Sequence, residues 1–272
     1  MRLFSILAIA VSALMLAVGC ASKKPTEIKS PALESAERLE HRGSAAYAKG
    51  DHIGAAKDFQ TASYVYESLA MIDALANVQL SLARIDSDDG RPAEGLARVN
   101  RVLNLPNTGA AISPSTLLLA QGRAAALYLQ QKNLNAAGNA LTAAESLCAS
   151  PCEAASALSV LRASWHLASG DLVAAKAKAA TALNQAGTPA DKANALRSFA
   201  QIGLAQSLYP QAARDGLQAL QLDQLIGASN RVIADLDLLA SIYTKAGDTP
   251  KATEYTDLSR AATAARAHLG GK

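Results

Sequence analysis

Three observations predict an all-α fold, a solenoid of helix pairs. Half of the 272 residues are hydrophobic but only 4% are aromatic, so alanine and leucine must supply the core. That composition favours helices packed across small side chains and disfavours a β-sandwich. One sequence pattern recurs at intervals of about 37 to 42 residues. Ser-Pro or Thr-Pro dipeptides also occur where the pattern expects a helix to begin.

The recurring pattern is a helix, a turn containing Gly or Asn, and a second helix with small residues at fixed positions. Small residues on the two helices let them approach closely. A glycine in the turn takes a positive φ that a Cβ would oppose. The pattern predicts about six helix pairs, with equivalent second-helix positions at Ala55, Gly95, Ala137, Ala175, Ala212 and Ala252.

Over residues 31–269 this spacing resembles the tetratricopeptide repeat. The match is clearest in the last repeat, at Leu239, Ala240, Tyr243, Gly247 and Ala252. The resemblance implies a right-handed solenoid with a concave face for a protein partner. The family's usual period is about 34 residues, so we expect longer helices or connections here.

Helix starts are predicted independently by capping residues. Ser30-Pro31, Ser113-Pro114, Ser150-Pro151 and Thr188-Pro189 each place a capping hydroxyl before a proline at the first helical position. Ser150 with Glu153, and Thr188 with Asp191, have capping-box spacing. Asp51 and Asp171 are expected to cap the second helices of repeats one and four.

The N-terminus predicts a lipoprotein. After Arg2, an apolar run from Leu3 to Val18 leads to the stretch "AVGC" at Cys20, which resembles the bacterial lipobox. We expect a signal peptide over residues 1–19, a lipidated Cys20 with a polar tether over residues 20–30, and the repeat domain over residues 31–272. The alternative is an ordinary cleaved signal with an incidental cysteine.

Lipid attachment predicts the location. Two or three acyl chains on Cys20, palmitate among them, anchor a protein stably. Ala21 stands where aspartate would retain a lipoprotein in the inner membrane under enterobacterial-type sorting. The expected location is therefore the periplasmic face of the bacterial outer membrane.

The two remaining cysteines, Cys148 and Cys152, lie four residues apart with Pro151 between them. If Cys20 is lipidated, no thiol is left over when this pair closes, and an exported protein favours that outcome. A structural disulfide is expected. A metal pair or a redox pair is the alternative, although no histidine is near and the spacing is not C-x-x-C.

No sequence signature of catalysis occurs, so we expect no enzyme, no cofactor and no metal site. The net charge of +3 gives no signal for nucleic acid. The stretch "DSDDG" over residues 86–90 lacks the spacing of a calcium loop. It is interpreted as a solvated turn.

The expected function is a protein-binding scaffold or assembly factor for an envelope machine, serving pilus or secretion, outer-membrane or cell-wall assembly. The chain resembles most closely the pilotin-type lipoproteins that carry such repeats. The alternatives are a cell-wall enzyme and a lipoprotein that binds a small ligand in the solenoid trough. The family's basic clamp for a carboxylate is missing, because Glu40 occupies a lysine position.

The family's groove positions predict an apolar middle with polar ends. They include Leu80 in repeat two, and Leu119, Gly122, Ala126 and Leu129 in repeat three. We expect an apolar helix or extended segment of the partner across repeats three and four, oriented by Arg84 and Arg197. If the superhelix is tight, the apolar groove residues pack on each other instead. The candidate partner-binding residues are Arg84, Leu119, Leu129, Val160, Leu167, Arg197 and Gln201.

Overall fold

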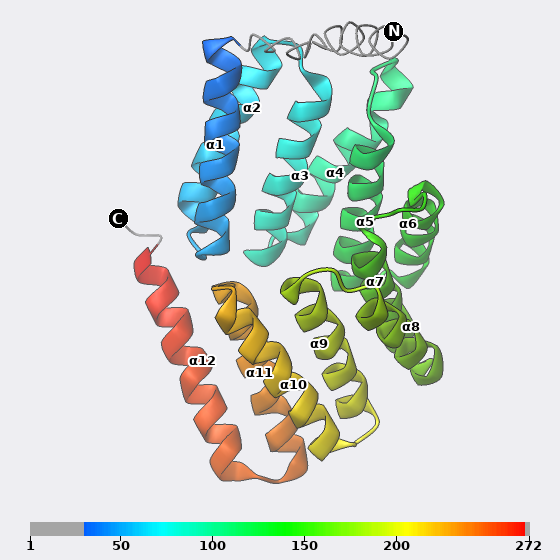
Figure 1. Cartoon of the computed structure of the whole chain (residues 1–272), viewed down its shortest axis with the longest axis vertical. Coiled ribbons are helices and arrows are strands. Elements are labelled where there is room, and N and C mark those ends of the chain that lie inside the picture. Colours follow the sequence, from blue (N-terminus) through cyan, green and yellow to red (C-terminus); the bar gives the residue numbers. More distant parts are fainter. Residues whose placement is uncertain (1–29, 270–272) are drawn as a thin grey trace, which may run out of the picture. The chain divides into compact units, whose positions relative to one another are not determined.

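Consecutive helices account for nearly all of the chain that the structure describes, residues 30–269 of a computed structural model (Figure 1). Within this range there are twelve α-helices, one short 3₁₀ helix and no strand. They are α1 (Pro31–Ala48), α2 (His52–Ser68), α3 (Ile72–Asp88), α4 (Pro92–Asn104), η1 (Leu105–Thr108), α5 (Pro114–Gln130), α6 (Leu134–Leu147), α7 (Ala155–Ala168), α8 (Leu172–Asn184), α9 (Pro189–Ala205), α10 (Tyr209–Leu225), α11 (Ser229–Ala246) and α12 (Thr249–Leu269).

Neighbours in sequence are neighbours in space, as a helical-repeat solenoid requires. The helices pair as α1/α2, α3/α4, α5/α6, α7/α8, α9/α10 and α11/α12, which confirms the predicted six repeats. Every second-helix position predicted to be equivalent is buried, and four of the alanines are completely inaccessible. Alanine therefore sets the close spacing of the helices, and leucine fills the space between pairs.

Capping confirms most of the predicted helix starts. Thr188 and Asp191 form a complete capping box at α9, and the Ser113 side chain accepts from the Thr116 amide at α5. Asp51 and Asp171 cap α2 and α8 as expected.

The predicted start at Ser150 is wrong. Helix α7 begins at Ala155 without a side-chain cap, and the Ser150–Pro151 peptide bond is cis. Cys148 and Cys152 are joined by a disulfide with their Cα atoms 5.4 Å apart. The bridge closes this segment as a turn, so the helix begins only after the second cysteine.

Positive φ values follow the first helix of each repeat. Glycine occupies this position in four repeats, among them Gly90 with φ 75° and Gly247 with φ 78°. The other two repeats place Lys132 and Ser207 there, with φ 58° and 61°. The turn geometry is thus common to all six repeats, although two of them lack the residue that adopts it most easily.

The acidic stretch at the end of α3 is not simply solvated, which corrects its interpretation as an exposed turn. The Asp86 carboxylate is buried and accepts from Arg91 at 2.8 Å and from Arg98 Nε at 2.7 Å. Its neighbour Asp89 accepts from His52 of α2. Asp86 therefore stabilises the packing within repeat two, and Asp89 connects that repeat to the first.

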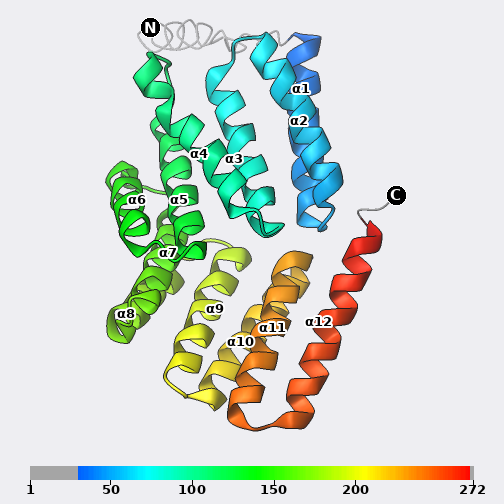
Figure 2. The same cartoon turned by 180° about the vertical axis from the view of Figure 1, so that it is seen from behind.

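The residues from Ala32 onwards form one compact unit, in which the last repeat contacts the first (Figures 1 and 2). A Cβ added to Gly50 would lie 2.7 Å from Ser229 Oγ and 2.8 Å from Arg266 Cγ. The turn between α1 and α2 is therefore packed against α11 and α12. No helix within residues 30–269 has both the length and the apolarity to cross a bilayer. The predicted signal, Cys20 and most of the tether lie outside the described residues.

Candidate functional site

The sequence-predicted groove stripe of repeat three is accessible on α5. Leu119 is 52% exposed, and Gly122, Ala126 and Leu129 are each half-buried. Five other apolar residues of α5 are core residues, namely Leu118, Ala120, Ala124, Ala125 and Leu127. The predicted groove positions of this helix are therefore more accessible than these core residues.

Leu119 also borders an apolar hollow of about 370 Å³. The hollow lies between the first half of α5 and the turn that carries the disulfide. Its lining includes Leu118, Leu147, Pro151 and Cys152. This volume suits one or two apolar side chains of a partner.

Helix α7 continues the accessible surface less completely. Val160 is half-buried, whereas Leu167 packs against the core cluster of Ala163, Ala179 and Ile202. Leu80, expected to be a groove position of repeat two, is a core residue with 5% exposure. Its placement in the groove is wrong, because it packs into the cluster shared by repeats two and three.

Arg197 is held inside the protein. Its Nε donates to Asp235 at 2.6 Å, and one terminal nitrogen donates to both Asp223 and Asp235. Its other terminal nitrogen donates to Asn194 at 2.9 Å. The guanidinium thus joins α9, α10 and α11, and its donors are directed at internal acceptors rather than at a partner. Gln201, one turn further along α9, is half-buried.

The acidic partners of Arg197 are completely buried. Burial raises the pKa of Asp235 to about 6, although the bond to Arg197 acts in the opposite direction. Burial would lower the pKa of Arg197, but the hydrogen bond that it donates to Asp235 and the charges of both carboxylates raise it overall. The cluster is therefore a structural ion pair with an excess of negative charge.

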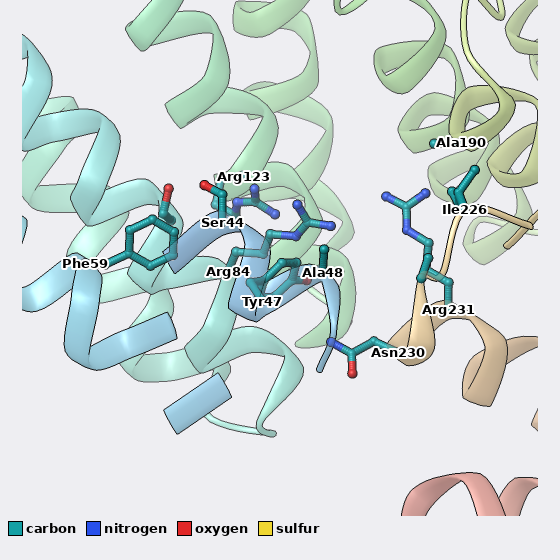
Figure 3. A pocket seen from close by; sticks show the side chains of 12 residues that line it. Ser44, Tyr47, Ala48, Phe59, Arg84, Arg123, Ala190, Ile226, Asn230 and Arg231 are labelled. Carbon is teal, nitrogen blue, oxygen red and sulfur yellow. The ribbon is translucent and has the colours of Figure 1, made fainter. Parts of the chain in front are cut away.

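A second hollow, of about 350 Å³, contains the other predicted polar residue, Arg84 (Figure 3). We call it the arginine pocket. The first helices of repeats one to three and Phe59 of α2 line it on one side, and α9, the α10–α11 connection and the start of α11 line the other. Its lining residues are Ser44, Tyr47, Ala48, Phe59, Ser81, Arg84, Arg123, Ala190, Ile226, Ala228, Asn230 and Arg231.

Three guanidinium groups face the arginine pocket from three helices. Arg84 comes from α3, Arg123 from α5 and Arg231 from α11, and Figure 3 shows Arg231 extending from the side opposite the other two. No ion pair within residues 30–269 involves any of the three. Arg231 donates to the neutral Asn194 at 2.9 Å.

Arg123 has the least compensated charge. Its Nε is buried and has no hydrogen-bond partner among the described residues. Burial, with a further contribution from the charge of Arg84, lowers the pKa of Arg123 to about 10. Burial followed by the charge of Arg84 also lowers the pKa of Arg231. The pocket therefore holds positive charge at an energetic cost that a bound anion would relieve.

Tyr47 contacts Arg84, His52 and Asp88. The Arg84 guanidinium lies over the Tyr47 ring, 4.3 Å from its centre, and the Tyr47 and His52 rings are stacked with their centres 5.4 Å apart. The Tyr47 hydroxyl donates to Asp88. Burial is the main reason that the pKa of Tyr47 rises to about 12, so it remains a neutral phenol at physiological pH.

Sequence reasoning missed Arg123 and Arg231. Arg123 is the lone charged residue of α5, "PSTLLLAQGRAAALYLQ", and an isolated charge in an apolar helix was a usable signal. No comparable signal marked Arg231, because only the return of α11 toward the first repeats brings it to Arg84. The described residues contain no cluster of His, Cys, Asp and Glu that could hold a metal ion.

Comparison with known proteins identifies the fold and no family. No protein-family model and no curated protein matches the chain. Among solved structures, BtubC (BKLC) from P. vanneervenii is similar with a TM-score of 0.53 and 14% identity, covering 90% of this chain and 94% of that one. At this identity, the likeness shows a shared helical fold alone.

Two further solved structures are less similar. A tetratricopeptide repeat protein from Parabacteroides merdae has a TM-score of 0.45 at 15% identity, covering 87% of this chain and 94% of that chain. The C-terminal part of a repeat-containing protein from Cytophaga hutchinsonii has a TM-score of 0.37 at 13% identity, with coverages of 82% and 92%.

Proposed function

We propose that this chain is a protein-interaction scaffold or assembly factor of a bacterial envelope machine, held at the periplasmic face of the outer membrane by lipid on Cys20. The anchor is supported by the "AVGC" stretch and the polar tether that follows it. The scaffold role is supported by six helix pairs that leave side chains of their first helices accessible.

The observation that carries the scaffold role is the half-exposed Leu119 beside its apolar hollow. Isolated exposed leucines are common on protein surfaces. Leu119 differs because it borders a concave apolar space and is followed along α5 by the accessible Gly122, Ala126 and Leu129. Apolar anchors seated in such hollows supply most of the binding energy of protein interfaces. We assign this surface to an apolar helix or extended segment of the partner.

The partner surface is tested by crosslinking the native lipoprotein in membranes and identifying the partner. Leu119→Asp is expected to abolish the crosslink while thermal unfolding is unchanged. Leu258→Asp is the matched control, because Leu258 is 46% exposed on α12, away from the hollow. Equal crosslinking by both variants would show that the partner binds elsewhere.

The anchor is tested separately. Cys20→Ser should abolish lipid labelling of the chain, leave the signal unprocessed by the lipoprotein pathway and remove the chain from the outer-membrane fraction. If the variant remains in the outer-membrane fraction with unchanged processing, the lipid anchor is wrong. This outcome would leave the scaffold surface on α5 standing.

A further inference from the structure

The arginine pocket has no role in the proposed scaffold surface on α5 and α7. It is built by residues from six helices and from the connection before α11. Burial and the charge of Arg84 both disfavour the charged forms of Arg123 and Arg231, so this arrangement has a cost to the fold. Such an arrangement is expected where a ligand supplies the missing negative charge.

The charge of the pocket indicates an anion with more than one negative charge. Three guanidinium groups line it, and the nearby carboxylate of Asp88 is directed at the Tyr47 hydroxyl. With Asp88 counted, a single carboxylate would leave one positive charge uncompensated. A phosphoryl dianion would compensate both remaining charges.

The geometry indicates a tetrahedral oxyanion. Arg84, Arg123 and Arg231 approach from three different helices, with Arg231 on the side opposite the other two (Figure 3). A carboxylate has its acceptor sites in a plane, whereas a phosphoryl group has three terminal oxygens that point in different directions. Planar guanidinium groups bind such oxygens with paired donors.

The pocket is already organised for binding. Arg84 is held against the Tyr47 ring, and the Asn230 side chain is held between His52 Nε2 at 2.6 Å and Arg266 at 2.7 Å. Groups held before binding lose little freedom on binding, which favours affinity. Arg123 lines the pocket, and its buried Nε has no hydrogen-bond partner among the described residues.

The remaining lining indicates that the phosphoryl group belongs to a small organic molecule. Phe59, Ala190 and Ile226 supply apolar surface, and Ser44 and Ser81 supply neutral hydroxyls. The volume of about 350 Å³ is at the lower end of small-molecule sites. We propose that the arginine pocket binds the phosphate monoester group of a small molecule through Arg84, Arg123 and Arg231.

Calorimetry on the full-length chain in detergent tests this proposal. The probes are inorganic phosphate and glycerol 3-phosphate, at pH 7.5 and constant ionic strength. Both should bind, and glycerol 3-phosphate should bind more tightly if the organic part contacts the apolar lining. Equal affinities would indicate a site for free phosphate, bound by the same three arginines. Arg123→Gln should weaken both by roughly 10- to 100-fold, as expected for lost bonds to a charged group.

A stability measurement separates lost binding from lost folding. Because Arg123 is buried without a partner, Arg123→Gln should raise the melting temperature without phosphate and remove the increase that phosphate produces. Arg260→Gln is the control for net charge, since Arg260 is exposed on α12 and paired with Asp257. Should Arg123→Gln not fold, Arg231→Gln supplies the same comparison.

Hexaglutamate is titrated as an acidic-peptide probe in the same way. Three results would overturn the proposal: no binding of either phosphate probe, equal affinity of the Arg123→Gln and Arg260→Gln variants for these probes, or Arg123-dependent binding of hexaglutamate but of neither phosphate probe. The last result would assign the pocket to an acidic peptide. None of these results bears on the surface around Leu119, so the pocket and the scaffold role can fail independently.

Discussion

Asn230 Nδ2 lies 2.6 Å from His52 Nε2 and so joins two residues 178 positions apart. The other ring nitrogen of His52 faces the Asp89 carboxylate. The network therefore assigns the hydrogen to Nδ1, and Nε2 accepts from the Asn230 amide. The Asn230 oxygen in turn accepts from Arg266 at 2.7 Å. This chain of bonds links the first two repeats to both helices of the last.

Breaking this link should loosen the contact between the first and last repeats. In a double-mutant cycle of His52→Ala and Asn230→Ala, we expect a coupling free energy of about 0.5–1.5 kcal/mol, measured by urea unfolding. A cycle of Ser159→Ala with Asn230→Ala should show none, because Ser159 bonds to Gln185 instead. Zero coupling in the first cycle would mean that the two repeats are held together by other contacts.

The buried Asp235 should make stability depend on pH. Its pKa is raised from 3.8 to about 6, so between these values the folded state binds more protons than the unfolded state. The unfolding free energy must then decrease as the pH rises through this range, by up to about 3 kcal/mol above pH 6.

Asp235→Asn should reduce this decrease, and urea unfolding at pH 4.5 and pH 7.5 measures it. Asp257→Asn is the control, because Asp257 is exposed on α12. If both variants lose the same stability between the two pH values as the unmodified chain, Asp235 is already ionised when folded at low pH.

Two glycines should respond in opposite ways to alanine. A Cβ on Gly95 of α4 would lie 2.8 Å from the Ala83 carbonyl oxygen of α3, whereas at Gly122 the nearest atom is 3.8 Å away. Gly95→Ala should lower the unfolding free energy by about 1–3 kcal/mol. Gly122→Ala should raise it by about 0.5–1 kcal/mol, because alanine loses less entropy in a helix. Melting temperatures of the pair provide the measurement, and a stabilised Gly95→Ala would show that α3 and α4 can separate freely.

The disulfide between Cys148 and Cys152 should contribute little to stability. It closes a very short loop, so its removal in a double serine variant should cost about 2 kcal/mol or less. Peptide mapping of periplasmic material, alkylated before reduction, should find the two cysteines joined. Recovery of both as alkylated thiols would contradict the disulfide in the native protein.

The repeat architecture could be predicted because each signal is local. A helix pair contacts mainly its sequence neighbours, so buried alanines such as Ala55 and Ala175 recur with the period of the structure. Caps act within one turn of helix, which is why Thr188 with Asp191 could be identified. The start at Ser150 failed because a covalent bond between Cys148 and Cys152 overrides a local cap.

The contacts between charged residues could not be predicted from such local signals. From the sequence alone came the helical class, the six repeats and the accessible register of α5 with Leu119 on its surface. The tertiary structure alone decided which charges meet: Arg197 is buried against carboxylates of α10 and α11, and Arg84 shares a pocket with Arg123 and Arg231. The physical reason is that charge pairing depends on distances between helices far apart in the chain. Those distances are set by the summed packing of every repeat between them.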